Sequence, residues 1–503
     1  MIFNTATNPQ SEIVLEETSS VCPVCKQVLP ATLVRRANRV IMLKTCPQHG
    51  NFESLVYGDA EMFERIKPFN KPGTPPLQFK SKVEKGCPWD CGLCPEHRQH
   101  QCLGIIEVNS ACNLDCPICF ADAHGPGNHT GSFELSLEQV TYMLDSFVAC
   151  EGKPEVVQFS GGEPTLHPHI LDFIALAKER GITYVMLNTN GIRIARDDRF
   201  LEELAKTKAH IYLQFDGFDP QTNLTLRGRA DLLEIKMKAL ERLAQADLRV
   251  VLVPAIEQGV NEHEIGRIVE FGIRHPAVFG VSFQSAFRAQ RHLERDPLQR
   301  ITTPDILKAI ETQTNGLLRL SDFVPIPCCA PTCGVATYAM LTAERVIPIP
   351  RVVPVNLYLD YITNRSIPNL DADLLNMLEK LWSSGAKVGS DQATRFVLEA
   401  LARARVPVQV DEPDWTGERC GSCRVGLPIG PHNTRDLGRH IFMISVRDFM
   451  DADNFDVNDI HKCCIGVLQP DGRSIPFCAY NSLGYRERTV ARLQAEPGWI
   501  GTD

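Results

Sequence analysis

The chain has 503 residues, of which 44% are apolar, and its 52 basic and 61 acidic side chains give a formal charge of -9. This length corresponds to roughly three packed domains, and the acidic balance gives no general electrostatic reason to expect nucleic acid as a partner. The 19 cysteines, many of them in closely spaced groups, do not fit the paired disulfides of small secreted domains and predict metal sites in a reduced compartment instead.

Targeting signals are not evident in the sequence. Residues 1–17 lack the basic end and apolar run of a signal peptide. No stretch approaches the roughly 20 apolar residues that a membrane-spanning helix needs. We therefore expect a cytoplasmic protein without a transmembrane segment, for which peripheral contact with a membrane stays open.

Residues 1–75 are predicted to form an N-terminal metal-ribbon domain. Cys22 and Cys25 form one C-x-x-C pair, and Cys46 with His49 follows a strand-like run at 40–43. Two such turns facing each other hold zinc or a single iron tetrahedrally in ribbon domains. The expectation is a structural metal, zinc or a single iron, with His49 as the fourth ligand. The alternative is an electron-transfer iron of the rubredoxin type, which takes a fourth thiolate that this block does not supply.

Residues 76–104 follow a proline-rich connector and contain a C-x-x-x-C-x-x-C run of Cys87, Cys91 and Cys94, with Cys102 close behind. Four thiolates are enough to close every corner of a four-iron cluster. This segment is predicted to hold an auxiliary [4Fe-4S] cluster, and a zinc site built from the same four cysteines is the alternative.

The same spacing recurs at Cys112, Cys116 and Cys119, directly after an apolar run at 105–108. Three thiolates this close can hold three corners of an iron–sulfur cube, which leaves the fourth iron without a protein ligand. The alternatives are a zinc knuckle, which usually needs two C-x-x-C pairs, or three structural cysteines. We predict that this loop is the catalytic centre.

Residues 105–310 alternate between strand and helix patterns. Apolar runs predict six strands, at 105–108, 156–160, 183–188, 210–215, 249–255 and 278–284. Ser136 and Gln139 form a capping box that opens one of the helices between them. Such alternation predicts parallel strands with right-handed crossovers. The predicted fold class is α/β, a partial (β/α)6 barrel with its chemistry at the carboxyl ends of the strands, between the metal-ribbon domain and a cysteine-rich C-terminal domain.

The cysteine loop, with Ile118 before its last cysteine and Phe120 after it, resembles the signature loop of the radical S-adenosylmethionine enzymes. The resemblance implies that the open iron of a [4Fe-4S] cluster binds S-adenosylmethionine. One electron, from a ferredoxin or flavodoxin, then splits it into methionine and a 5′-deoxyadenosyl radical. That radical removes a hydrogen atom from an unactivated carbon.

Several strand ends then become candidate cofactor positions. Gly161, Gly162 and Glu163, before Pro164, resemble the GGEP motif of the family, which holds the methionine amino group. Asn188 resembles the ribose-contacting position, and Asn190 lies beside it in the turn that closes the third strand.

The next strands supply further candidates. Gln214 and Asp216 close the fourth strand and are expected to face the barrel mouth, a simple capped turn being the alternative. Arg227 is a candidate partner for the methionine carboxylate or a substrate anion, and a solvated surface arginine is its alternative. Val253, on the fifth strand, belongs to the region where family members form the adenine pocket.

Residues 311–503 are marked by further cysteines and by helical patterns at 304–314, 370–382 and 391–404. Adjacent cysteines diverge, so each of the pairs Cys328–Cys329 and Cys463–Cys464 is expected to supply one ligand. A second auxiliary cluster is predicted from Cys329, Cys333, Cys464 and Cys478. Cys420 and Cys423 either hold a metal or are incidental, and Cys150 is expected to be a core thiol.

Over nearly its full length the chain resembles the tetraether lipid synthase group, earlier regarded as methyltransferases of a pterin pathway. The resemblance is carried by the ribbon, the two cysteine runs, and the stretches 327–333 and 470–481. It implies that the terminal carbons of two lipid chains are joined, at the expense of two molecules of S-adenosylmethionine. The alternatives are a radical methyltransferase acting on a pterin or other small molecule, a peptide-modifying enzyme, and last an iron–sulfur electron carrier.

Overall fold

The computed structural model describes residues 12–123, 125, 132–326, 329–341, 345–351 and 441–501. The chain divides into two compact units: the described residues up to Ala336 and from Ile444 onward form the larger one, and the described residues between them belong to the smaller one. The helices predicted at 370–382 and 391–404 lie outside the described residues, as do Cys328, Cys420 and Cys423.

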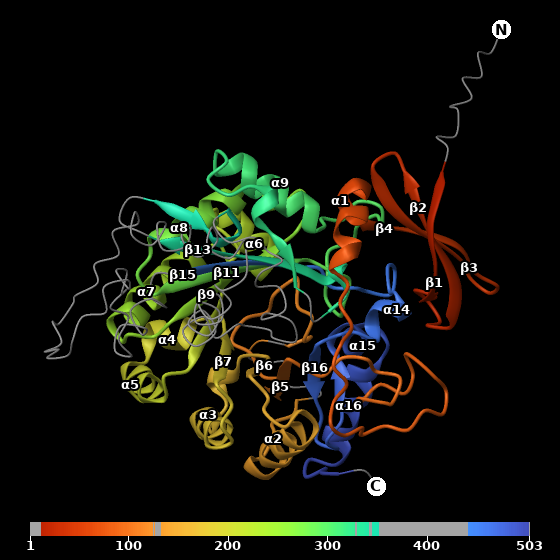
Figure 1. Cartoon of the computed structure of the whole chain (residues 1–503). Helices are drawn as coiled ribbons and strands as arrows, with labels where there is room; N and C mark the ends of the chain where they lie inside the picture. The colour runs from red at the N-terminus through yellow and green to blue at the C-terminus, as the bar shows by residue number, and fades with distance from the viewer. Residues whose placement is uncertain are drawn as a thin grey trace, which may run out of the picture. The chain divides into compact units, whose positions relative to one another are not determined.

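The N-terminal ribbon is a four-stranded antiparallel meander in which sequence neighbours pair (Figure 1). Its strands are β1 (Ile13–Val21), β2 (Val28–Arg36), β3 (Arg39–Cys46) and β4 (Gly50–Tyr57). Alternate residues of β2, among them Leu29, Ala31 and Leu33, are buried, as expected for a sheet with one covered face. Asp59 caps the following helix α1 (Ala60–Ile66), which leads into the short helix η1 (Lys67–Phe69).

The six predicted parallel strands are all present and confirm the repeat. They are β5 (Leu103–Asn109), β6 (Val156–Gly161), β7 (Tyr184–Thr189), β8 (His210–Gln214), β9 (Val250–Val253) and β11 (Val278–Ser285). Each pairs in parallel with the next, and β10 (Ala255–Ile256) extends the pairing with β11. Nearly every side chain of β5 to β9 is at least partly buried, as expected for a parallel sheet covered on both faces.

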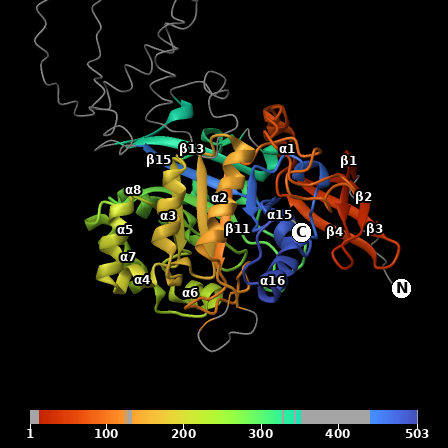
Figure 2. The ribbon, with the colours of Figure 1, turned by 90° about the horizontal axis from the view of Figure 1, so that it is seen from below.

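Helices connect successive strands and line the outside of the sheet (Figures 1 and 2). They are α2 (Leu137–Glu151), η2 (Pro164–Leu166), α3 (Ile170–Glu179), α4 (Ile192–Arg196), α5 (Asp198–Thr207), α6 (Pro220–Arg227), α7 (Leu232–Gln245), η3 (Glu262–Glu264), α8 (Ile265–Arg274) and α9 (Thr303–Gln313). The capping box predicted at Ser136 is confirmed, since its hydroxyl accepts from the Gln139 backbone N–H and the Gln139 side chain accepts from Ser136.

The C-terminal residues return to the strand where the barrel begins. Strand β16 (Ile465–Leu468) pairs in parallel with β5, placing Ile465 opposite Leu103, and β17 (Ser474–Pro476) pairs antiparallel with β16. The helices α14 (Val457–Ile460), α15 (Phe477–Ser482) and α16 (Tyr485–Ala495) complete this segment. It also contacts the ribbon, because the Thr18 hydroxyl donates to Asp456 at 2.9 Å.

The remaining strands are β12 (Val324–Pro325), β13 (Gly334–Leu341), β14 (Val346–Pro348) and β15 (Ile441–Arg447), and β12 and β14 each pair antiparallel with β13. The remaining short helices are η4 (Leu320–Asp322), η5 (Pro331–Cys333) and η6 (Ile349–Arg351). Among the described residues, no helix is both long and apolar enough to cross a bilayer.

Candidate active site and metal centres

The loop with Cys112, Cys116 and Cys119 follows the carboxyl end of β5, where parallel barrels place their chemistry. The backbone of Cys119 exchanges two hydrogen bonds with Arg291, at 2.9 and 3.3 Å. Arg227 donates to the carbonyl of Ile118 at 3.2 Å, so the loop is fixed at its second half from two sides. All three thiols are half-buried. Three half-buried thiols on one fixed loop are the donor set that three irons of one cluster take.

Burial also sets the protonation of two of these thiols, those of Cys112 and Cys116. It raises the pKa of Cys112 to about 12, with the Glu163 carboxylate adding to the shift, and it raises the pKa of Cys116. Both groups are therefore neutral thiols near pH 7 in the chain without iron. A bound cation reverses this preference, because a coordinating thiol loses its proton to the metal's charge.

Gly161 and Gly162 shape the start of the loop. A Cβ atom at Gly162 would lie 2.2 Å from the Ala111 carbonyl oxygen, and one at Gly161 would lie 2.3 Å from that of Asn109. The backbone N–H groups of Gly162 and Glu163 donate to these same carbonyls, both at 2.8 Å. The space that the missing side chains leave is thus taken by the segment that leads into Cys112.

Glu163 is buried directly beside this contact. One carboxylate oxygen accepts from the hydroxyls of Thr165 and Thr189, at 2.6 and 2.7 Å, and the other accepts from the backbone of Asn190 at 2.8 Å. The second oxygen therefore keeps room for another donor, as the predicted contact with an ammonium group requires. The nearby Oδ1 of Asn109 is buried without a hydrogen-bond partner among the described residues.

Asn188 and Asn190 lie at the end of β7. The Asn188 amide donates to the Ser160 hydroxyl at 3.0 Å. The Asn190 amide donates to the Asn113 side chain, inside the cysteine loop, at 2.6 Å. Val253, on β9, is buried with 8% of its surface exposed. The predicted cofactor positions on β5, β6 and β7 thus contact one another directly.

Beneath them runs a buried polar chain that we call the polar layer, made of Lys236, Gln214, Asp216 and Arg227. Lys236, on α7, donates to the Asn190 carbonyl at 2.5 Å and to the Gln214 side chain at 3.0 Å. Gln214 donates to Asp216 at 2.7 Å. The position of Lys236 was not predicted, since one lysine in an amphipathic helix gives no sequence signal.

Arg227 ends the polar layer. Its side chain is 12% exposed and forms two hydrogen bonds of 2.7 Å with Asp216. The alternative of a solvated surface arginine is therefore wrong. Although burial acts against both charges, the pair holds the pKa of Asp216 below its usual value and raises that of Arg227.

Four phenylalanines, one of them the residue after Cys119, form what we call the aromatic wall: Phe120, Phe287, Phe449 and Phe477. Phe120, next to Cys119, has its ring centroid 5.5 Å from Phe477 and 6.4 Å from Phe287. Phe449 lies 4.8 Å from Phe477. The wall continues into an apolar cluster that contains Cys91 and Cys478.

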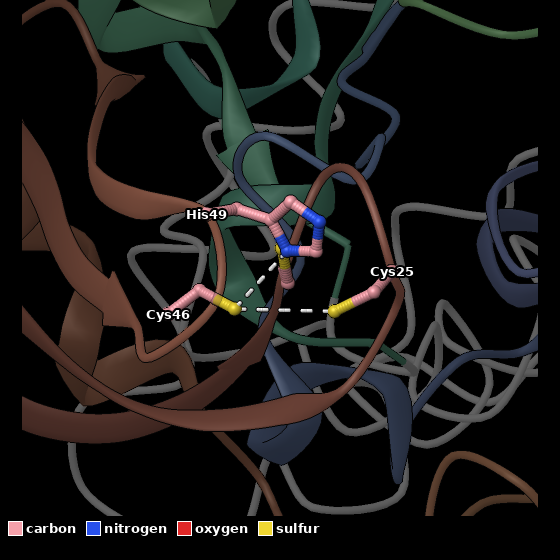
Figure 3. A group of neighbouring side chains, drawn as sticks. Cys25, Cys46 and His49 are labelled. Atoms are coloured by element: carbon pink, nitrogen blue, oxygen red, sulfur yellow. Dashed lines mark hydrogen bonds between the residues drawn. The ribbon is translucent and has the colours of Figure 1, made fainter.

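The ribbon domain holds a second candidate metal centre (Figure 3). The ligand atoms of Cys22, Cys25, Cys46 and His49 all lie within 4.8 Å of one another, as predicted from the two turns. The sulfurs of Cys25 and Cys46 are 3.9 Å apart, and His49 Nδ1 is 3.4 Å from Cys46 Sγ. A tetrahedral zinc with sulfurs at about 2.3 Å separates them by about 3.8 Å, so the geometry fits.

The remaining cysteines pack in groups that differ from those predicted from their spacing in the sequence. Cys102 packs with Cys329, Cys464 and Cys333 in one buried cluster. The pairing of Ile465 with Leu103 explains this, because Cys102 and Cys464 precede neighbouring residues of adjacent parallel strands. Cys91 and Cys478, with the half-buried Cys87 and Cys463, belong to the apolar cluster of the aromatic wall. Cys150 is a buried residue of α2.

Residues 106–272 match the Radical SAM superfamily, and residues 14–58 match the HMPTM N-terminal zinc ribbon domain. These matches and the strand order confirm the predicted fold class.

The 7,8-dihydro-6-hydroxymethylpterin dimethyltransferase of Methanocaldococcus jannaschii is 33% identical over 501 residues, which cover 94% of each chain. The GTP 3',8-cyclase of Vibrio parahaemolyticus is 29% identical over 171 residues, 34% of this chain and 49% of that one. Among solved structures, Streptococcus suis SuiB has a TM-score of 0.35 at 17% identity, over 43% of this chain and 46% of that one.

Proposed function

Because the chain belongs to the radical S-adenosylmethionine superfamily, and within it to the group of the pterin dimethyltransferase, we propose that it joins the ends of two lipid alkyl chains by a carbon–carbon bond. Forming each carbon–carbon bond requires the removal of one hydrogen atom from each of two terminal methyl groups. The reaction therefore consumes two molecules of S-adenosylmethionine and two electrons, and it releases two methionines and two 5′-deoxyadenosines.

The observation that carries the substrate class is the aromatic wall beside Cys119. Phe120, the residue after Cys119, packs on Phe287 and Phe477. An alkyl chain gains contact and loses no hydrogen bonds in such surroundings. A flat heterocycle with many donors and acceptors would leave polar groups unpaired there, at a cost of about 1–3 kcal/mol each.

Different residues of the cysteine loop and the strand ends would bind the cluster and S-adenosylmethionine. When bound, the [4Fe-4S] cluster supplies the electron that cleaves S-adenosylmethionine reductively. Cys112, Cys116 and Cys119 would hold the cluster, and Glu163 with Asn109 would accept from the methionine ammonium. Asn188 would face the ribose. The polar layer supports these residues, because the Lys236 amine donates a hydrogen bond to the Asn190 carbonyl.

The other cofactors and partners are part of the same proposal. The ribbon holds zinc, and the remaining cysteine groups hold two auxiliary [4Fe-4S] clusters. The electrons come from a ferredoxin or flavodoxin, and the protein works in the cytoplasm. A lipid substrate also implies peripheral contact with a membrane surface.

A second candidate is methylation of a reduced pterin. It is favoured by the relative at 33% identity, whose name gives it 7,8-dihydro-6-hydroxymethylpterin as substrate and dimethyl transfer as reaction. The two candidates predict different products. Chain coupling removes two hydrogens in total and joins two chains, whereas methylation adds one CH2 per transfer.

The test uses anaerobically reconstituted protein with reductant, S-adenosylmethionine and either of two substrates. One is a vesicle of saturated lipids deuterated at their terminal methyl groups, and the other is the dihydropterin. We expect deuterated 5′-deoxyadenosine and a coupled lipid only from the vesicle. A methylated pterin without lipid coupling would move the assignment to the second candidate. Cys116→Ala should abolish formation of 5′-deoxyadenosine with both substrates. Cys150→Ala should not, because Cys150 is a buried cysteine outside these groups.

A further inference from the structure

We propose that His461, and not Cys102, completes the metal site of Cys87, Cys91 and Cys94, and that this site holds a four-iron cluster with one imidazole ligand. Cys102 then joins Cys329, Cys333 and Cys464 in the second auxiliary site. The inference rests on the part of the proposed function that gives the chain auxiliary clusters, and it is independent of the substrate.

The first observation is the state of the His461 ring. Both ring nitrogens are shielded from solvent and form no hydrogen bond of ordinary geometry with a described residue, and the ring contacts the Cys87 thiol. Buried polar atoms nearly always have strong partners, so an imidazole that contacts a candidate ligand thiol points to a metal that binds both groups.

The second observation is that the backbone holds His461 in place without using its ring. His461 follows α14, which the Thr18–Asp456 hydrogen bond ties to the ribbon. The His461 carbonyl accepts from the backbone of Arg98 at 2.8 Å, which fixes it to the segment behind Cys94. These contacts place the His461 ring at the Cys87 loop, and none of them involves a ring nitrogen.

The Cys87 loop is likewise preformed. One oxygen of Asp90 accepts from the backbone of residues 84, 85 and 86, at 2.7 to 2.8 Å. The Tyr485 hydroxyl accepts from the Cys91 N–H at 3.2 Å and donates to the Pro88 carbonyl at 2.9 Å. Because these bonds fix the loop without a metal, replacing one ligand should leave the fold intact.

The third observation is where Cys102 goes. It packs with Cys329 and Cys464, because β5 and β16 run in parallel and start in register. The thiol of Cys102 also lies 3.8 Å from His100 Nε2 and 3.8 Å from the Gln99 amide. The set of Cys102, Cys329, Cys333 and Cys464 therefore already has four thiols.

The spacing of the ligands favours a cluster over a single ion. Within the part of the chain that the structure describes, only the ribbon site has all its ligand atoms within 4.8 Å of one another. The thiols of Cys87, Cys91 and Cys94 and the imidazole of His461 do not form such a tight group. A cube of iron and sulfide separates its ligands farther than one ion does.

The experiment uses the full chain, reconstituted anaerobically and reduced without S-adenosylmethionine, and records pulsed electron paramagnetic resonance. We expect a strong nitrogen coupling from a ligating imidazole. It should vanish in His461→Ala and remain in Cys102→Ser. His97→Gln is the matched control: that imidazole is also buried, but it bonds the Cys463 carbonyl at 2.9 Å. His461→Cys should retain the cluster, lose the coupling and lower its midpoint potential, since a thiolate adds negative charge.

The possible failures are distinct. A coupling that survives in His461→Ala, or a Cys87 site that takes zinc, overturns the inference. Loss of the nitrogen-coupled cluster in Cys102→Ser overturns the reassignment of that thiol. If a chain with Cys112, Cys116 and Cys119 replaced by alanine binds no iron at all, the auxiliary clusters of the proposed function fail as well.

Discussion

Arg227 and Asp216 form a buried ion pair with two hydrogen bonds of 2.7 Å, and Arg227 extends from that pair to the carbonyl of Ile118 in the cysteine loop. The pair therefore connects the end of β8 to the loop after β5. Asp216 also accepts from the backbone of Ala255 at 3.0 Å, after β9. Asp216 and Arg227 together thus connect the ends of β8 and β9 to the cysteine loop.

Replacing Asp216 by asparagine should be strongly destabilising. The change keeps the side-chain volume but leaves the Arg227 charge buried and uncompensated, which costs about 3–5 kcal/mol. The measurement is chemical unfolding of the chain, together with its iron content. Asp231→Asn breaks the exposed pair of Asp231 with Arg229 and should cost less than about 1 kcal/mol. Equal effects of the two variants would contradict a structural role for the buried pair.

Substitution of Gly162 by alanine should displace the start of the cysteine loop. The added Cβ would lie 2.2 Å from the Ala111 carbonyl, which is backbone and has no rotamer to change. We expect a several-fold loss of iron at the catalytic cluster and of 5′-deoxyadenosine formation. Gly181→Ala is the control, because nothing lies within 4 Å of its Cβ; its positive φ of 76° costs only about 1 kcal/mol. A Gly162→Ala protein with full iron content would show that the loop adapts.

Most of the barrel is predictable from the sequence because its signals are local. Each of the six strands is a short apolar run, and the order of parallel pairing follows from the alternation with helices. The ribbon site is predictable for the same reason: its four ligands lie on two short turns joined by hairpin strands.

The long-range pairings are not predictable in this way. Ile465 lies opposite Leu103, 362 positions earlier, and nothing in the local pattern of β16 specifies that partner. Because this pairing decides which thiols meet, sequence spacing groups Cys102 with Cys87, whereas packing groups it with Cys464. Lys236 was missed for a similar reason, since only the folded helix buries it against Gln214.

Lys236 should make stability depend on pH above 8. Burial lowers its pKa to about 8, although Asp216 opposes the shift, whereas a lysine in the unfolded chain titrates near 10.4. Between these values the unfolded chain binds the extra proton, so stability rises with pH there, by at most about 1.4 kcal/mol per unit. Below pH 8 both states are protonated and the contribution is constant.

The check is the unfolding free energy of the wild-type chain and of Lys236→Met at pH 7.5 and 9.5. Between these pH values the unfolding free energy of Lys236→Met should rise less than that of the wild type, by up to about 1.4 kcal/mol per pH unit. Lys206→Met is the control, because that lysine is exposed and pairs only with Glu203. Identical pH slopes in the wild type and Lys236→Met would show that the buried amine is not titrating in this range.

His49 should decide whether the ribbon keeps its metal. It is one of the two exposed members of the set, with Cys25, and its Nδ1 lies 3.4 Å from Cys46 Sγ and 3.6 Å from Cys22 Sγ. His49→Ala leaves three thiolates, so we expect at least tenfold weaker metal binding, measured by competition with a chelator. Metal binding and folding are coupled in small ribbons, and the ribbon should therefore become sensitive to proteolysis in the same variant. His49→Cys supplies a fourth thiolate and should keep a metal, with iron now competing better against zinc.

The ribbon packs on the C-terminal segment through the hydrogen bonds of Lys44 to the carbonyls of Ala452 and Asp453, at 2.8 and 2.7 Å. If His49→Ala lost its metal but stayed as protease-resistant as the wild type, these contacts, and not the metal, would be what holds the ribbon in its fold.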